Sequence, residues 1–187
     1  PDDAPTFLES FRDAGWKTAV ATALTPGTPD AFIRGTRTTR AFHRQATRVG
    51  PAAIELLDSF GDDRFFLIVY YTGAHAPYQK RPGVPDFGST LPDLYDSEIA
   101  YTDRELGPIL DHLRGERLRD RVVVVFVSDH GEAFGEHGDY YHGHNMYDES
   151  TRVPMLWSVP GLAPRRLGQA PVSLLDLAPT LLNLAGL

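Results

Sequence analysis

The sequence predicts an α/β domain in which helices cover a mostly parallel sheet on both faces. Four short apolar runs, two of them almost continuous in β-branched and aromatic residues, have the composition of strands buried on both faces. Segments with apolar residues at helical spacing alternate with these runs, as in a doubly wound fold. The chain has 187 residues, which is long enough to bury a core without a disulfide or a metal.

The four predicted strands are the apolar runs themselves. They cover Lys17–Leu24, Phe65–Thr72, Val122–Ser128 and Val153–Val159. Four helices are predicted before, between and after them, at Pro5–Ala14, Pro51–Phe60, Leu94–Leu113 and Ser173–Leu184. Gly107 and Pro108 lie inside the third helical pattern, and they predict a bend or a boundary there.

A basic segment precedes the second helix. Its arginines recur every three or four residues, so that on a helix they would share one face: Arg34, Arg37, Arg40, Arg44 and Arg48. We interpret this segment as a solvated or packing face, with a polyanion-binding patch as the alternative.

The composition excludes several classes of protein. Hydrophobic residues make up 42% and charged residues 23%, which is typical of a folded domain rather than a disordered, collagen-like or coiled-coil chain. Eighteen basic against 25 acidic residues give a net charge of −7, which argues against general nucleic-acid binding. The absence of cysteine excludes a disulfide scaffold, a cysteine zinc site and a cysteine nucleophile.

No apolar run is long enough to span a membrane. The chain starts at Pro1 without a signal-peptide pattern, so we expect a fragment or a processed chain, and the compartment stays open.

The richest chemistry follows the second and third predicted strands. Asp129 and His130 come directly after the run VVVVFVS, where a carboxylate and an imidazole at a strand end suit a divalent cation; a plain surface turn is the alternative. Five of the seven histidines lie in the two loops that follow these strands: His75, His130, His137, His142 and His144. Ligands of open α/β sheets bind beyond the carboxyl ends of strands, so these loops are the first candidate site.

Several segments resemble the sulfatase family of the alkaline phosphatase-like superfamily. They are VVVVFVSDHGEAFGEHG, HGHNMYDESTRVPMLW and PVSLLDLAPTLLNLAGL, with FLESFRDAGWKTAVAT, FFLIVYYTGAHAPY and YDSEIAYTDRELGPILDHL before them. The resemblance covers nearly the whole chain, in the order of the carboxyl-terminal part of that family's catalytic domain. It therefore implies an alkaline phosphatase-like α/β fold that is incomplete at the N-terminus, with residues 1–187 forming one partial catalytic domain.

The resemblance also implies roles for particular residues. Asp129 and His130 match metal ligands, and His75 matches a histidine that contacts the substrate anion. Many arylsulfatases have a lysine where this chain has Gly143, so we expect His142 or His144 to take over the contact with the leaving group or the anion. The family implies Ca²⁺ as the metal, with Mn²⁺ or Zn²⁺ as alternatives because imidazole suits those ions better.

The nucleophile of the family has no counterpart in this sequence. No Cys/Ser-x-Pro-x-Arg motif occurs, and Asp2, Asp3, Thr25 and Thr28 are poor substitutes for the missing ligands and nucleophile. We therefore expect that half of the site upstream of Pro1. The function implied is a metal-dependent hydrolase of small-molecule or glycan sulfate esters, inactive as this piece alone. A phosphoryl transferase or phosphodiesterase of the same superfamily, and a non-catalytic relative, are the alternatives.

Overall fold

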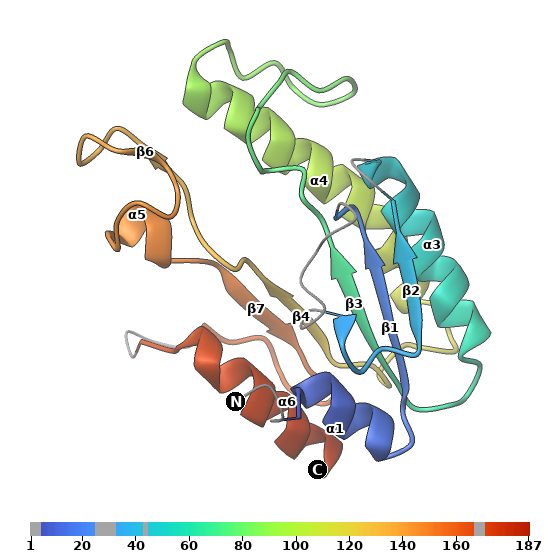
Figure 1. Cartoon of the computed structure of the whole chain (residues 1–187). Helices are drawn as coiled ribbons and strands as arrows, with labels where there is room; N and C mark the ends of the chain where they lie inside the picture. The colour runs from blue at the N-terminus through green and yellow to red at the C-terminus, as the bar shows by residue number, and fades with distance from the viewer. Residues whose placement is uncertain (1–4, 25–32, 43–44, 167–170) are drawn as a thin grey trace.

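The computed structural model describes residues 5–24, 33–42, 45–166 and 171–187. Along the chain, the elements are α1 Phe7–Asp13, β1 Lys17–Thr22, β2 Thr38–Ala41, α3 Ala46–Ser59, β3 Phe65–Tyr70, α4 Leu91–Leu113, β4 Val124–Val127, β5 Ala133–Phe134, β6 Tyr140–Tyr141, α5 Asp148–Thr151, β7 Met155–Ser158, the 3-10 turn η1 Leu174–Asp176, and α6 Leu177–Ala185 (Figure 1). Within these described ranges, no helix is both long and apolar enough to cross a bilayer.

A three-stranded parallel sheet in the order β2-β1-β3 forms the centre of the fold. In its register, Val20 of β1 lies opposite Ile68 of β3 and Thr39 of β2. All residues of β1 after Lys17 are buried. The predicted α/β class is confirmed, and the apolar run that forms β1 is buried as a central parallel strand requires.

Helices cover both faces of this sheet, and two adjacent phenylalanines of β3 show how. Side chains alternate between the faces of a strand. Phe65 stacks on Phe60 at the end of α3, with ring centroids 5.0 Å apart. Phe66 instead packs against Phe7 and Phe11 of α1, at 5.5 and 4.5 Å. Helices α3 and α1 therefore lie on opposite faces, with α4 beside α3 and α6 beside α1 (Figure 1).

Strands β4 and β7 form a separate antiparallel pair. Val125 lies opposite Trp157, and Phe126 lies opposite Leu156. The chain between the two strands holds β5, β6 and the four-residue helix α5 rather than a long crossover helix, and β7 returns antiparallel to β4. This arrangement leaves the long loops after β3 and β4 as the segments that carry the histidines.

The basic segment does not form the helical face that its arginine spacing suggested. Residues Thr38–Ala41 form strand β2, and only Arg48 of the series lies in a helix, α3. Arg44 lies outside the described residues. Two adjacent threonines favour the extended backbone, and pairing with β1 outweighs the helical spacing of the arginines.

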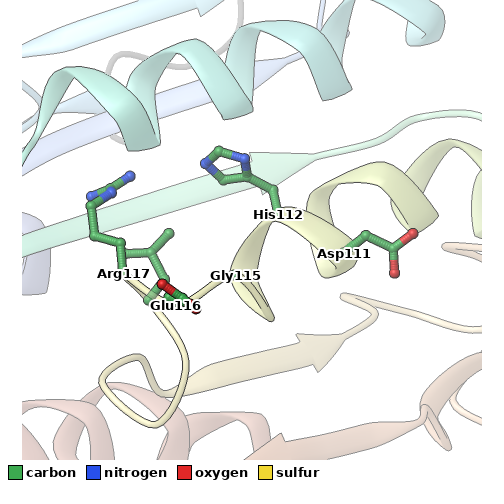
Figure 2. A pocket seen from close by; sticks show the side chains of 6 residues that line it. Asp111, His112, Gly115, Glu116 and Arg117 are labelled. Atoms are coloured by element: carbon green, nitrogen blue, oxygen red, sulfur yellow. The ribbon is translucent and has the colours of Figure 1, made fainter.

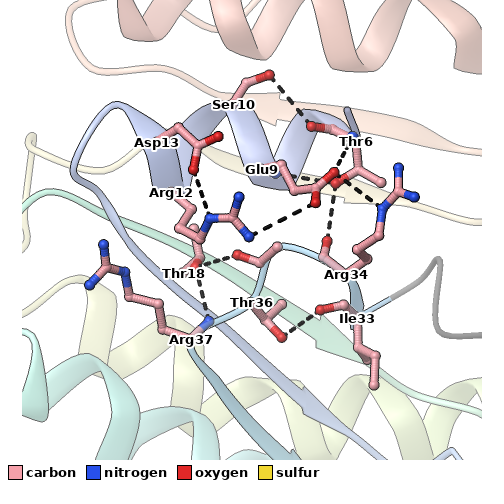
Figure 3. Close-up of polar contacts among 11 residues, drawn as sticks. Thr6, Glu9, Ser10, Arg12, Asp13, Thr18, Ile33, Arg34, Thr36 and Arg37 are labelled. Atoms are coloured by element: carbon pink, nitrogen blue, oxygen red, sulfur yellow. Dashed lines mark hydrogen bonds and ion pairs between the residues drawn. The ribbon is translucent and has the colours of Figure 1, made fainter. Parts of the chain in front are cut away.

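Hydrogen bonds fasten the start of β2 to the first helix and strand (Figure 3). Thr6 caps α1, and the Glu9 carboxylate accepts a bond from the Thr6 backbone N–H at 2.8 Å and pairs with Arg34 at 3.1 Å. Thr18 of β1 donates to the Gly35 carbonyl at 2.8 Å. Gly35 has φ +97°, and a Cβ there would lie 2.6 Å from the Glu9 backbone nitrogen, so this close approach requires glycine.

Helix α4 differs from its predicted form. It continues through Gly107 and Pro108 to Leu113, so the predicted boundary is wrong. Proline removes one backbone donor, but Ile109 is buried and Leu106 packs on the same core, so burial of the apolar stripe holds the helix together across the proline.

Candidate active site

Asp129 and His130 are the second and third residues after Val127, which ends β4, so both lie at the carboxyl end of that strand. The Nδ1 atom of His130 is 2.7 Å from the Gly131 carbonyl oxygen, so Nδ1 carries the proton and donates. The other ring nitrogen, Nε2, is then free to act as a ligand, and it lies 3.7 Å from Oδ1 of Asp129. These two atoms form a donor pair of the kind that a divalent cation accepts.

Tyr70, at the end of β3, holds the other oxygen of Asp129. Its hydroxyl donates to Oδ2 of Asp129 at 3.1 Å. Burial, together with the neighbouring Asp129 carboxylate, raises the pKa of Tyr70 to about 12. Tyr70 therefore stays protonated near neutral pH, and it orients the carboxylate as a neutral donor.

Two further imidazoles, from two other loops, lie near this pair. The ring of His142 stacks on that of His130, with centroids 3.8 Å apart and planes 25° apart. The ring of His75, from the loop after β3, meets His142 edge-on at 5.2 Å. The structure therefore brings His75, Asp129, His130 and His142 together, although they are spread over 68 positions of the sequence, from 75 to 142.

His144 does not join this group. It is exposed, and no hydrogen bond, ion pair or ring contact joins it to another described residue. His137 also lies apart, since its Nδ1 is 2.7 Å from Glu149 and its ring stacks on Tyr147 at 3.7 Å. The hydrogen bond with His137 lowers the pKa of the Glu149 carboxyl. Of the two histidines left open by the sequence, the geometry thus favours His142.

A buried carboxylate lies behind His142. Glu132 is only 7% exposed. Its Oε1 is 3.0 Å from Nδ1 of His142, and its Oε2 accepts a hydrogen bond from the Tyr78 hydroxyl. Burial and the hydrogen bond to Glu132 raise the pKa of Tyr78 far above its ordinary value. Glu132 thus connects the loop after β3 to the loop after β6.

Gly131 allows the two parts of the site to approach each other. Its N–H donates to the Ser150 carbonyl at 2.8 Å, at the end of α5. A Cβ at position 131 would overlap the carbonyl oxygen of Glu149 and lie 3.1 Å from the carbonyl carbon. The segment that bears Asp129 and His130 can therefore lie against α5 only because residue 131 has no side chain.

Asn145 braces the loop that contains His142. Its amide donates to Asp139 at 2.8 Å, and its oxygen accepts from the Tyr147 backbone and the Ser150 hydroxyl, both at 3.2 Å. These bonds close the loop from β6 to α5 on itself, which limits the positions that His142 can take.

The described residues do not form a complete metal site. Among them, no group of three or more His, Asp or Glu side chains is arranged to hold a cation. Asp129 and His130 offer two donor atoms, Oδ1 and Nε2, at the spacing given above, and Oδ1 also accepts a hydrogen bond from the His130 backbone N–H at 3.1 Å. Asp2, Asp3, Thr25 and Thr28, considered above as substitutes for missing groups, lie outside the described residues.

A pocket of about 220 Å³ lies elsewhere, at the carboxyl end of α4 (Figure 2). It is lined by Asp111, His112, Gly115, Glu116, Arg117 and Leu118. These residues precede β4, so the pocket belongs to the amino side of the strand whose carboxyl side bears Asp129. His112 and Arg117 in its lining pair with Asp58 of α3, at 3.0 and 3.1 Å, which assigns them a structural role.

Two residues of the site went without a role in the sequence analysis. Glu132 follows Asp-His-Gly directly, and an acid inside a histidine-rich loop is the signal that could have identified it. Tyr70 is one of two adjacent tyrosines that follow the apolar residues FFLIV, and a hydroxyl at the end of such a run is the signal for it. Both signals are weak because neither residue is close in sequence to all of its partners.

Comparisons with known proteins agree on one family. The sequence model described as "Sulfatase" matches residues 5–187. Choline-sulfatase from Rhizobium meliloti (strain 1021) is 40% identical over 93 residues, which are 50% of this chain and 18% of that protein. The chain thus spans far less than two thirds of this relative's length.

Solved structures share the fold at low identity. A structure of Ps i-CgsB in complex with k-i-k-neocarrahexaose matches 100% of this chain and 54% of its own, with a TM-score of 0.76 and 20% identity. The C-terminal periplasmic domain of phosphoethanolamine transferase EptC from Campylobacter jejuni matches 82% of this chain and 55% of its own, with a TM-score of 0.70 and 21% identity. These likenesses support the alkaline phosphatase-like fold.

Proposed function

Because the chain belongs to the sulfatase family, we propose that it is the carboxyl-terminal part of a metal-dependent hydrolase of sulfate esters. The observation that carries this proposal is the convergence of a carboxylate and three imidazoles at the strand ends. Sulfatases generally use a divalent metal, and a metal bound here would supply positive charge to polarise the ester and stabilise the developing anion.

The proposal gives each residue of the group a task. Asp129 and His130 would hold the metal through Oδ1 and Nε2, which lie 3.7 Å apart, while the Tyr70 hydroxyl orients the carboxylate and the Gly131 carbonyl orients the imidazole. His75 and His142 would contact the sulfate oxygens or the leaving oxygen, because the His142 ring stacks on His130, the His75 ring meets His142, and neither is a member of the donor pair.

The rest of the active site would come from residues that this chain does not include. Two donors are too few to hold a hard cation against water, and the described residues offer no third acid or histidine in position. We therefore treat residues 1–187 as one part of the catalytic domain, and we assign the nucleophile and the remaining metal ligands to the other part. The family favours Ca²⁺ as the metal, with Mn²⁺ and Zn²⁺ as alternatives because the imidazole of His130 suits those ions better.

The test uses the full-length protein and two substrates, 4-nitrophenyl sulfate and 4-nitrophenyl phosphate. We expect turnover of the sulfate, loss of turnover in EDTA, and recovery on adding back one of the three cations. The cation that restores the highest rate identifies the metal. Preference for the phosphate would favour the phosphotransferase alternative, for which the fold of EptC is the supporting likeness.

A matched pair of variants locates the activity. Asp129→Asn should abolish turnover and metal binding measured by calorimetry. Asp111→Asn changes an exposed aspartate that pairs only with Arg114, so both should be unchanged. Wild-type metal binding in Asp129→Asn, or no turnover of either ester by the wild-type protein with any of the cations, would contradict the proposal.

A further inference from the structure

We propose that Glu132 is a positioning residue that fixes the ring of His142, so that Nε2 of that ring faces the substrate. This inference rests on the proposed function. It assigns a role to Glu132, which acts through His142 and contacts neither the substrate nor the atoms that would bind the metal. The geometry that carries it is the chain of contacts from Tyr78 through Glu132 to His142.

The burial of Glu132 requires an explanation. A carboxylate with 7% of its surface exposed has lost most of its hydration, and no lysine or arginine pairs with it among the described residues. Its neighbours include an aromatic cluster in which Tyr95 packs on Tyr78 and on Phe134, at 5.3 and 5.2 Å. An apolar residue of the same size would fill this space at a lower desolvation cost, so the carboxylate is there for its hydrogen bonds.

The two hydrogen bonds have a defined direction. The Tyr78 hydroxyl donates to Oε2, which leaves Oε1 to face His142. In this proposal Oε1 is the acceptor, and Nδ1 of His142 carries the proton that it donates across the 3.0 Å contact. In the neutral ring, Nε2 is then the unprotonated nitrogen; in the charged ring, Nε2 is a donor directed away from Glu132.

Glu132 also determines where the ring lies. His142 follows β6, whose last residue Tyr141 has φ +69°, and it precedes Gly143, which has φ +84°, so the backbone around it turns sharply. The ring is nevertheless held against His130 at 3.8 Å, and the only hydrogen-bond partner of its side chain among the described residues is Glu132. Without this bond, rotation about the side chain's two torsions would carry Nε2 away from the site.

The experiment compares three substitutions in the full-length protein. Glu132→Met keeps the length of the side chain and removes both acceptors. Glu132→Gln keeps one acceptor oxygen and the shape. Glu149→Met removes the acid of the other Glu–His pair in the same region, and serves as the matched control.

We expect kcat for 4-nitrophenyl sulfate to fall by about 10- to 100-fold in Glu132→Met, in line with the loss of other groups that orient active-site ligands. Glu132→Gln should retain more activity than Glu132→Met, and Glu149→Met should retain the wild-type rate. Equal losses in Glu132→Met and Glu132→Gln would show that hydrogen bonding is not the role of Glu132. A wild-type rate in Glu132→Met would overturn the proposal.

A second readout does not depend on activity. Nitrogen-15 chemical shifts of labelled histidine report which ring nitrogen carries the proton, and subtraction of a His142→Asn spectrum isolates His142. We expect Nδ1 to be protonated in the wild-type protein and in Glu149→Met, and to lose its proton to Nε2 in Glu132→Met. The same tautomer in Glu132→Met as in the wild-type protein would overturn the proposal. If the full-length protein hydrolyses no ester, the proposed function fails, while the tautomer still decides the role of Glu132.

Discussion

Replacing Gly131 with alanine adds one methyl group at the tightest point of the site. This methyl would overlap the carbonyl oxygen of Glu149 and lie 3.1 Å from its carbonyl carbon and 3.5 Å from that of Ser150. All of these are backbone atoms, so no side chain can rotate to make room. The two segments must separate, and the bond from the Gly131 N–H to the Ser150 carbonyl, now 2.8 Å, must lengthen or break.

The size of the effect follows from these two losses. Overpacking at a tight position costs about 1–3 kcal/mol, and the lost hydrogen bond adds about 1 kcal/mol. We therefore expect Gly131→Ala to lower the free energy of unfolding by about 2–4 kcal/mol in urea titrations of the full-length protein. Because residue 131 adjoins His130, metal affinity measured by calorimetry should fall as well.

Gly107 provides the matched control for the same chemical change. It lies inside α4, and a Cβ there would meet nothing within 4 Å. Alanine favours the helix over glycine, so Gly107→Ala should raise stability by about 0.5–1 kcal/mol. If Gly131→Ala proved as stable as the wild-type protein, or if both substitutions lowered stability equally, the steric reasoning would be refuted.

Three further predictions concern single interactions. Arg81→Ala leaves the fully buried Glu98 without its partner at 2.7 Å, so we expect a loss of about 3 kcal/mol in urea unfolding, and an unchanged stability would contradict this ion pair. The pKa of Glu9 is lowered, first by the hydrogen bond that its carboxylate accepts from the backbone N–H of Thr6 at the helix cap. Its contribution to stability is therefore present above the unfolded pKa of about 4.3 and is lost as the pH falls through the lower folded pKa. Glu9→Gln should flatten the acid side of the curve of stability against pH, and a curve identical to that of the wild-type protein would exclude this contribution. Tyr70→Phe removes the donor to Asp129, and calorimetry should show metal affinity weakened by about 10-fold, whereas equal affinity would mean that the hydroxyl does not orient the carboxylate.

Local patterns in the sequence were sufficient for most of the fold. The runs that became β1, β3, β4 and β7 were predicted within two residues at each end, because a short apolar run is a local signal that depends on no distant partner. Strand β2 was missed because its residues are exposed and polar, and only pairing with β1 makes it a strand.

The candidate site divides in the same way. Asp129, His130 and His75 could be selected from the sequence because each follows an apolar run that predicts a strand, and the loops beyond strand ends carry ligands in α/β folds. The two strands, β3 and β4, lie in different sheets of the structure. The choice between His142 and His144 could not be made, since it depends on Glu132, on Tyr78 from another loop, and on stacking with His130. The sequence alone therefore determined which residue types stand at the strand ends. The tertiary structure decided which imidazole is held in place, because a hydrogen bond between side chains from different loops depends on distances that exist only once the chain has folded.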